Sequence, residues 1–204
     1  MTESLAEHWE NQYRERAGRW SGKVNATTAG VVEGLAPGSA IDLACGEGGD
    51  AVWLAQRGWS VTGVDISPTA VERARAAAAG LGGIEFVAAD LGDWEPPAAV
   101  DLVTSSFMHS RVEFPRVDIL RRAAGWVLPR GHLLVVTHAE APPWSGLAHD
   151  HHHEFPTPQG DLDELALDPE AWTVVRAEIL ERHATGPAGE QGLLKDGVLL
   201  LHRR

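Results

Sequence analysis

The chain of 204 residues has a single cysteine, Cys45, so it cannot close an intrachain disulfide. Its cysteine content therefore gives no sign of an exported, disulfide-stabilised protein. Basic residues are also scarce: 17 lysines and arginines stand against 29 aspartates and glutamates, a formal net charge of −12. An acidic surface repels phosphate backbones and anionic lipid headgroups, so nucleic acid and membrane surfaces are poor partners.

Long apolar runs are missing as well. No stretch approaches the roughly 20 apolar residues that a membrane helix needs, and residues 1–16 are polar and charged, unlike a secretory signal. We therefore expect a cytoplasmic protein. Apolar residues make up 44% of the chain and charged residues 23%, which is ordinary for a globular domain with a proper core.

Short apolar runs alternate with helical segments along most of the chain, a pattern typical of a parallel α/β sheet. Helices are expected over 3–17, from the turn at 46–49 to 56, over 68–79 and over 117–127, with a long loop at 139–158. Strands are expected at 39–45, 59–65, 84–88, 100–106 and 131–137, and an antiparallel pair over 172–180 and 197–202 would close the sheet.

The strongest local signal is a glycine-rich turn, Gly46–Gly49, between the first strand and its helix. Glycine lets the backbone lie close to a ligand, and the helix N-terminus adds free N–H groups and partial positive charge. Asp65 ends the second strand and follows the turn by about 20 residues, the offset of an acid that hydrogen-bonds ribose hydroxyls. Both elements lie at the carboxyl edge of the sheet, where α/β folds bind ligands.

Two cofactor types fit this turn. Gly46 and Gly48, followed by Ala51, also match the G-x-G-x-x-A pattern of a dinucleotide fingerprint, which would indicate a nicotinamide cofactor. Asp42, inside the first strand, favours a different cofactor, because a carboxylate there is awkward beside a pyrophosphate but can meet the ammonium group of S-adenosylmethionine (SAM). Asp90 and Leu91, after the third strand, add an acceptor for the adenine amine and a backbone N–H for a ring nitrogen.

Five segments resemble, in order and spacing, the motifs of class I SAM-dependent methyltransferases. They are Asp42-Leu-Ala-Cys-Gly-Glu-Gly48, Gly63-Val-Asp-Ile-Ser67, Ala89-Asp-Leu91, Asp101-Leu-Val103 and Leu128-Pro-Arg-Gly-His-Leu-Leu134. Within that superfamily the chain looks like the thiopurine and tellurite-resistance methyltransferase group, through Trp9-Glu-x-x-Tyr13, Trp20 and the run from Asp50 to Asp65.

This resemblance implies a Rossmann-like, doubly wound α/β fold with a seven-stranded, mostly parallel sheet and an antiparallel C-terminal strand. A SAM-binding methyltransferase domain would occupy residues 39–204, behind an N-terminal helical lid segment over 1–38. The turn glycines would flank the methionine part of SAM, and Ile66 would pack on adenine. The full set expected at the cofactor is Trp9, Tyr13, Trp20, Asp42, Ala44, Gly46, Gly48, Asp65, Ile66, Asp90, Leu91 and Ser106.

Two positions depart from the family pattern, and the lesser one is Arg130, which replaces the first of the two glycines usual before the fifth strand. Ala44 stands where the methyltransferase motif has its first glycine, so the turn is expected to tolerate a methyl group or to shift. The aromatic residues of the N-terminal helix, Trp9 and Tyr13, share one face and are followed by Trp20. Because aromatic faces attract cations, we expect these residues to close over the sulfonium of SAM.

On the acceptor side, methyl transfer from a sulfonium is an in-line displacement, so the protein mainly aligns the reactants and excludes water. His109, after the fourth strand, is the candidate base or orienting residue, and Arg111 is a candidate partner for an anionic substrate; a surface role is the alternative for both. The expected pocket residues are Phe107, His138, His151 and His153. Thiol, hydroxyl, amine and metalloid acceptors are all compatible.

The cluster His149–Glu154 has the ligand types of a metal site. Neighbouring residues of an extended chain point to alternate sides, however, so we expect a pocket-lining or solvated loop and no catalytic metal. The hypothesis from the sequence is SAM-dependent methyl transfer to a small molecule. A non-catalytic SAM-binding protein and a reductase that uses a nicotinamide cofactor are the alternatives.

Overall fold

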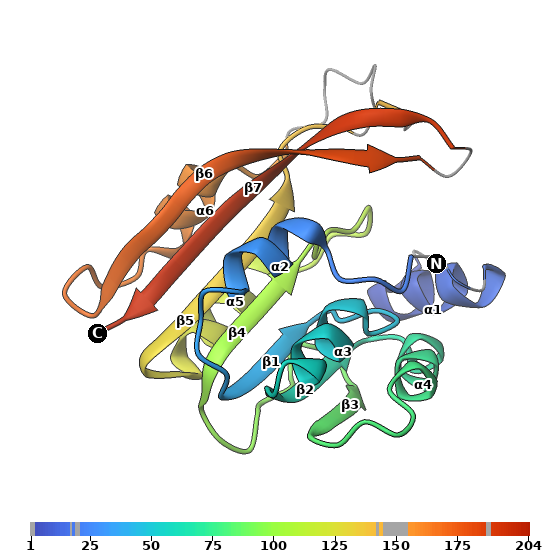
Figure 1. Ribbon diagram of the computed structural model, residues 1–204, viewed down its shortest axis with the longest axis horizontal. Coiled ribbons are helices and arrows are strands. Elements are labelled where there is room, and N and C mark those ends of the chain that lie inside the picture. Colours follow the sequence, from blue (N-terminus) through green and yellow to red (C-terminus); the bar gives the residue numbers. More distant parts are fainter. Residues whose placement is uncertain (1–2, 17, 19–20, 142, 145–154, 187–188) are drawn as a thin grey trace.

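The structure of the protein, a computed structural model, describes residues 3–16, 18, 21–141, 143–144, 155–186 and 189–204. These residues form a seven-stranded sheet with helices on both faces (Figure 1). The strands are β1 (Ser39–Leu43), β2 (Ser60–Asp65), β3 (Ile84–Ala88), β4 (Val100–Ser106), β5 (Val127–His138), β6 (Trp172–Thr185) and β7 (Gln191–Arg203). The helices are α1 (Leu5–Glu15), α2 (Ala26–Val32), α3 (Gly49–Gln56), α4 (Pro68–Ala77), α5 (Arg116–Gly125) and α6 (Pro158–Leu165).

The sheet has the strand order β3-β2-β1-β4-β5-β7-β6. The first five strands pair in parallel, β7 runs antiparallel to β5, and β6 runs antiparallel to β7. The expected doubly wound fold with an antiparallel C-terminal part is thereby confirmed. Because β1 to β5 share one direction, their carboxyl ends meet at a single edge, and the strand order reverses between β1 and β4, where such folds bind ligands.

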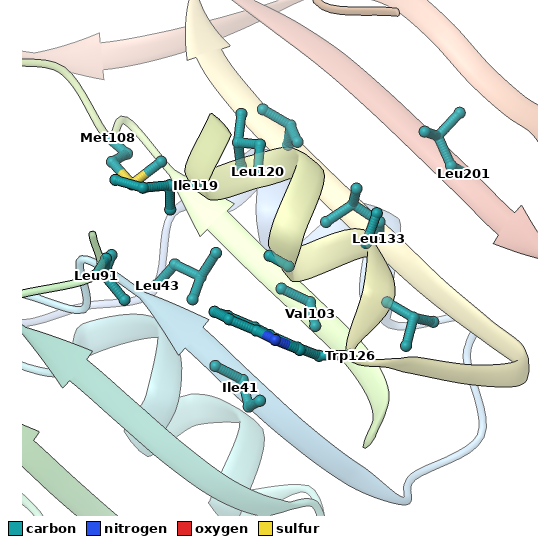
Figure 2. Close-up of a cluster of buried hydrophobic side chains, with 14 of the residues drawn as sticks. Ile41, Leu43, Leu91, Val103, Met108, Ile119, Leu120, Trp126, Leu133 and Leu201 are labelled. Carbon is teal, nitrogen blue, oxygen red and sulfur yellow. The ribbon is translucent and has the colours of Figure 1, made fainter. Parts of the chain in front are cut away.

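Apolar side chains fill both faces of the sheet, as expected for parallel strands covered by helices. Alternate residues of β1 supply the two sides: Ile41 and Leu43 belong to the cluster under α5, whereas Ala40 belongs to the cluster under α3 and α4. Figure 2 shows the first cluster, in which Leu120 of α5 and the ring of Trp126 lie over the sheet residues. The two cores fix the positions of the loops at the carboxyl edge.

Most expected elements are present, but several differ in their bounds; β6 and β7, for example, are both longer than expected. The helix expected over 117–127 ends at Gly125, and Val127 already pairs with Val100, so β5 begins four residues before the expected start. The start of α4 is as expected: the hydroxyl of Ser67 accepts a hydrogen bond from the Ala70 N–H at 3.1 Å, with proline at the first helical position.

Two short helices were not expected from the sequence. Helix α2 contains glycine and β-branched residues, so its propensity is weak, and its one clear signal is Asn25, which accepts from the N–H groups of Thr27 and Thr28. Helix α6 begins where a loop was expected to end; Thr157 caps it by accepting from Gly160 N–H at 2.9 Å. Within the described ranges, no helix is both long and apolar enough to cross a membrane.

Candidate cofactor and acceptor site

The turn after β1 is built by glycine geometry. Gly46 and Gly48 have φ values of +53° and +85°, in the left-handed region that glycine adopts without strain. A Cβ on Gly48 would lie 2.9 Å from the Cβ of Ala74, and one on Gly49 would lie 2.7 Å from the carbonyl oxygen of Lys23. The turn is therefore packed closely against α4 and the preceding segment. Helix α3 starts without a side-chain cap, which leaves its first N–H groups for a ligand.

Ala44 keeps the conformation that the missing glycine would take. Its φ is +53°, a left-handed conformation that costs a non-glycine residue about 1 kcal/mol. The turn nevertheless closes, because the Cys45 N–H donates to the Val64 carbonyl at 3.0 Å and the Gly48 N–H donates to the Cys45 carbonyl at 2.9 Å. The methyl group is accommodated and does not displace the turn.

Two further carboxylates lie behind this turn. Asp42 is 2% exposed, and its Oδ1 accepts from the Thr104 hydroxyl at 3.0 Å. Its Oδ2 is buried without a hydrogen bond of normal geometry, although the Ala51 N–H lies close enough to favour the charged form. Burial, together with the neighbouring Asp50 carboxylate, raises the pKa of Asp42 well above its usual range. Burial likewise raises the pKa of Asp50, which accepts from the Asn25 N–H at 2.8 Å.

Asp65 connects the loops that follow β1 and β2. Its Oδ2 accepts from the Gly46 N–H and its Oδ1 from the Ser67 N–H, both at 2.9 Å. The residue is only 5% exposed, and this burial raises the pKa of Asp65 to about 6. Each carboxylate oxygen has two lone pairs, so each can accept one further hydrogen bond from a ligand hydroxyl.

The expected adenine residues lie along the ends of β2 and β3. Ile66 is half-buried and is absent from the described core clusters, so its side chain is available to a ring. Asp90 is exposed, with Oδ1 accepting from the Gly92 N–H at 2.7 Å. The side chain of Leu91 is buried in the core under α5, so only its backbone can serve a cofactor.

Arg122 of α5 holds this last loop in place, a role that the sequence did not reveal. Its guanidinium donates to the carbonyl oxygens of Leu91 at 3.2 Å, of Trp94 at 2.7 Å and of Gly92, and to Glu95 Oε1 at 3.1 Å. A planar guanidinium with five donors suits such a convergence of carbonyls. The arginine fixes the loop that carries Asp90.

Replacing Arg122 by methionine is expected to weaken SAM binding several-fold and to lower the melting temperature by about 2–8 °C, since buried carbonyls lose their donor. The matched control is Arg121→Met on the same helix. Arg121 donates to the Glu164 and Leu165 carbonyls instead, so its loss should lower the melting temperature without changing SAM affinity. Calorimetric titration and thermal melts check both variants; equal SAM affinities would contradict the role of Arg122.

Helix α1 is docked beside the start of α4. Glu10 accepts from the hydroxyls of Ser67 and Thr69 at 2.6 Å each and from the Thr69 N–H at 3.2 Å. The rings of Trp9 and Tyr13 lie 6.1 Å apart, and Tyr13 is only 3% exposed. Helix α1 thus lies next to the segment that follows Asp65. Glu10 holds it there, through contacts that the sequence did not predict. Trp20 lies outside the described residues.

The acceptor side begins where β4 ends. The hydroxyls of Ser106 and Thr28 are 2.8 Å apart. Phe107 has a φ of +55°, a strained conformation for a bulky residue, and such strain gathers at functional sites. Its ring stacks on His138 with centroids 4.2 Å apart, and the His109 ring lies 6.0 Å from His138.

The remaining expected acceptor residues are Arg111, His151 and His153. Arg111 is exposed on the loop before α5. His151 and His153, with the rest of His149–Glu154, lie outside the described residues. Among the described residues, no group of three or more His, Cys, Asp or Glu side chains forms a metal site. Of the expected acceptor residues, Phe107, His109 and His138 are therefore the ones that the structure brings together.

Comparison with known proteins agrees with the fold. Residues 40–131 match the family described as "Methyltransferase domain". Over 105 residues the chain is 34% identical to 2-heptyl-1-hydroxyquinolin-4(1H)-one methyltransferase of Mycobacteroides abscessus, an alignment that covers 46% of each protein. The chain spans about half or less of the length of the curated relatives that it matches.

Two solved structures share the fold along nearly the whole chain. The N-methyltransferase NodS from Bradyrhizobium japonicum, in complex with S-adenosyl-L-homocysteine, has a TM-score of 0.71 at 15% identity and covers 98% of this chain and 99% of its own. TehB from Haemophilus influenzae has a TM-score of 0.67 at 16% identity and covers 96% of this chain and 67% of its own.

The fold is the Rossmann-like fold that these solved structures share. The match of residues 40–131 to a methyltransferase domain agrees with the class I resemblance seen in the sequence.

Proposed function

We propose that this protein binds SAM at the carboxyl edge of the sheet and transfers its methyl group to a small-molecule acceptor by in-line displacement. The observation that carries the proposal is the group of acids around the glycine turn, above all the buried and unpaired Oδ2 of Asp42. Buried carboxylates require partners. The ammonium and ribose hydroxyls of SAM supply them, whereas a pyrophosphate would add negative charge beside Asp42 and Asp50.

Each part of SAM then has a place along the edge. Its methionine end lies at the Gly46–Gly49 turn, with the ammonium toward Asp42. Its ribose is held by Asp65, and adenine packs on Ile66 with its edge at Asp90. SAM supplies an activated methyl group, so the protein's contribution is to align the acceptor with it and to exclude water.

The acceptor enters from the end of β4 and β5. Phe107, His109 and His138 line its place, and we extend the pocket to His151 and His153 of the loop after β5. Arg111 would meet an anionic part of the substrate at the entrance. This arrangement is compatible with the metal-free displacement, which needs a base only if the acceptor must lose a proton.

The acidity of the chain supports a small-molecule substrate. A net charge of −12 disfavours nucleic acid and membrane surfaces as partners. We therefore propose a cytoplasmic enzyme in which residues 39–204 form the SAM-binding domain and the segment before them contributes a lid.

Turnover distinguishes the enzyme from a non-catalytic SAM-binding protein. Purified protein is incubated with methyl-labelled SAM and a panel of small thiols, phenols, amines and metalloid oxyanions. The proposal predicts a labelled product and S-adenosylhomocysteine with at least one acceptor class. SAM binding without any product across the panel would favour the non-catalytic alternative.

We expect SAM to increase the protection of backbone amides in α1. The helix is docked through Glu10 onto the segment next to the proposed ribose site, and its aromatic face would cover the cofactor. Hydrogen exchange with and without saturating SAM measures this. Amides of α6, on the opposite face, serve as the internal control and should not change. Identical protection of residues 5–15 in both states would show that α1 is ordinary packing and not a lid.

A further inference from the structure

A histidine and a buried aspartate face each other where β5 and β7 pair. His138 is the last residue of β5 and lies directly opposite Asp196 of β7. Its Nδ1 is 3.7 Å from Asp196 Oδ1, and neither atom has a hydrogen bond of normal geometry. This separation is too long for a hydrogen bond, but a small rotation of the ring would close it. Two orphaned buried atoms that point at each other indicate a contact made when a ligand is bound.

Asp196 is fixed from two further elements. It is fully buried, and its Oδ2 accepts from Arg182 Nε of β6 at 2.5 Å and from the Thr27 hydroxyl of α2 at 2.7 Å. Burial alone would raise the pKa of Asp196, but the contacts with His138, Arg182 and Thr27 hold it below its usual range. The carboxylate is therefore ionised and immobile, and the positive charge of Arg182 nearly offsets its own. A carboxylate whose charge is offset in this way mainly fixes the orientation of a neighbouring imidazole. It raises the basicity of that imidazole less than an uncompensated carboxylate would.

The imidazole of His138 is presented to the acceptor side. The side chain is 27% exposed while Nδ1 is buried, which leaves Nε2 as the nitrogen within reach of a ligand. Phe107 stacks on one face of the ring with an interplanar angle of 25°, and its left-handed backbone conformation places it there. The ring plane is thus held by Phe107 and the ring edge by Asp196.

We propose that His138 is the proton acceptor of the reaction, that Asp196 is its positioning residue, and that the methyl acceptor is therefore a protic hydroxyl or thiol. The proposal rests on the proposed SAM-dependent function. With Nδ1–H directed at Asp196, Nε2 carries a free lone pair. As the acceptor heteroatom forms its bond to the methyl carbon, the carbon–sulfur bond of the sulfonium breaks and the acceptor proton passes to Nε2. The products are the methylated acceptor, a neutral thioether and an imidazolium beside Asp196.

The charged and titratable groups around His138 decide which side chain could compete with it for the acceptor proton. They are Asp196 of β7, Arg182 of β6, His109 of the loop after β4, and the ion pair Lys195–Glu140, at 3.1 Å, on the residues that follow along the same strand pair. Asp196 is paired with Arg182, and Lys195 is paired with Glu140. The second histidine, His109, is therefore the other imidazole that could take the acceptor proton, and the test must separate it from His138.

The test uses the whole chain with methyl-labelled SAM and three probes: phenol, 4-nitrophenol and 2-mercaptoethanol. Near pH 8, phenol keeps its proton, since its pKa is about 10 like that of tyrosine, whereas 4-nitrophenol is largely ionised. His138→Gln is expected to lower kcat with phenol by on the order of 10²-fold or more and to lower the rate with 4-nitrophenol far less. His132→Gln, earlier in the same strand and paired with His202, is the matched control and should behave as wild type. His109→Gln should not reproduce the selective loss of the phenol rate.

Asp196→Asn gives a separate readout. ¹⁵N NMR of the complex with S-adenosylhomocysteine should show His138 protonated at Nδ1 in wild type and a mixture of tautomers in the variant, with kcat reduced and KM little changed. If His138→Gln retains wild-type kcat with phenol, or if wild-type His138 is protonated at Nε2, the base assignment is wrong. If wild type binds SAM but methylates none of the probes, the protic acceptor class is wrong. If wild type does not bind SAM, the proposed function itself fails.

Discussion

Replacing Asp65 by asparagine is expected to lower the affinity for SAM by about 1.5–3 kcal/mol, on the order of 10- to 100-fold. The carboxylate accepts from two backbone N–H groups and keeps lone pairs for the ribose. An amide has one acceptor oxygen, so it cannot satisfy the Gly46 and Ser67 N–H groups and the ribose together. Titration calorimetry of the variant against wild type measures the loss.

Asp101→Asn is the matched control for this change. Asp101 also accepts two hydrogen bonds through one carboxylate, from the N–H and hydroxyl of Ser39 at 2.7 Å each, but it does so at the opposite edge of the sheet. Its replacement should reduce stability and leave SAM affinity as in wild type. Equal affinities of wild type and Asp65→Asn would remove Asp65 from the cofactor site.

Acidification is expected to weaken SAM binding while stabilising the free protein. The pKa of Asp65 is raised to about 6, against an ordinary value of 3.8. Between these values the folded state holds a proton that the unfolded state has released, so this group's contribution to stability falls as pH rises and levels off above about pH 6. The shift corresponds to about 3 kcal/mol at most. SAM needs the ionised form, so its affinity changes in the opposite direction.

Urea unfolding of wild type and Asp65→Asn at about pH 5 and about pH 7.5 isolates this contribution, because the variant lacks the titrating group. Asp42 and Asp50, whose pKa values are also raised by burial, contribute in the same direction in both proteins. The stability gained on acidification should be larger for wild type. If the free energy of unfolding depends on pH in the same way in both proteins, Asp65 is not a buried carboxylate that titrates in this range.

The glycine turn and the carboxyl edge of the sheet were predictable from sequence because their signals are local. A strand, a glycine turn and a helix follow one another within residues 39–56, and the acid at the end of the next strand falls beside them through parallel pairing alone. The capping of α4 by Ser67 is likewise a property of adjacent residues. Such features do not depend on where distant segments pack.

The residues that the sequence did not reveal act across long separations. Arg122 reaches back about 30 residues to the loop after β3, and Glu10 crosses from the N-terminal helix to the start of α4. Asp196 sits in a lysine-aspartate-glycine sequence with no motif, and it acquires meaning only when the β5–β7 register places it opposite His138. The one signal that the sequence contained for Asp196 was its charge, in a strand that pairs inside the sheet.

The central claim is that the carboxyl edge of this sheet is a SAM site. Titration calorimetry of the purified chain with SAM, S-adenosylhomocysteine and oxidised nicotinamide adenine dinucleotide tests it most directly. The account predicts one site per chain for SAM and for S-adenosylhomocysteine, with dissociation constants in the micromolar range that is ordinary for enzyme substrates, and no heat of binding from the dinucleotide. Binding of the dinucleotide with no response to SAM would contradict it.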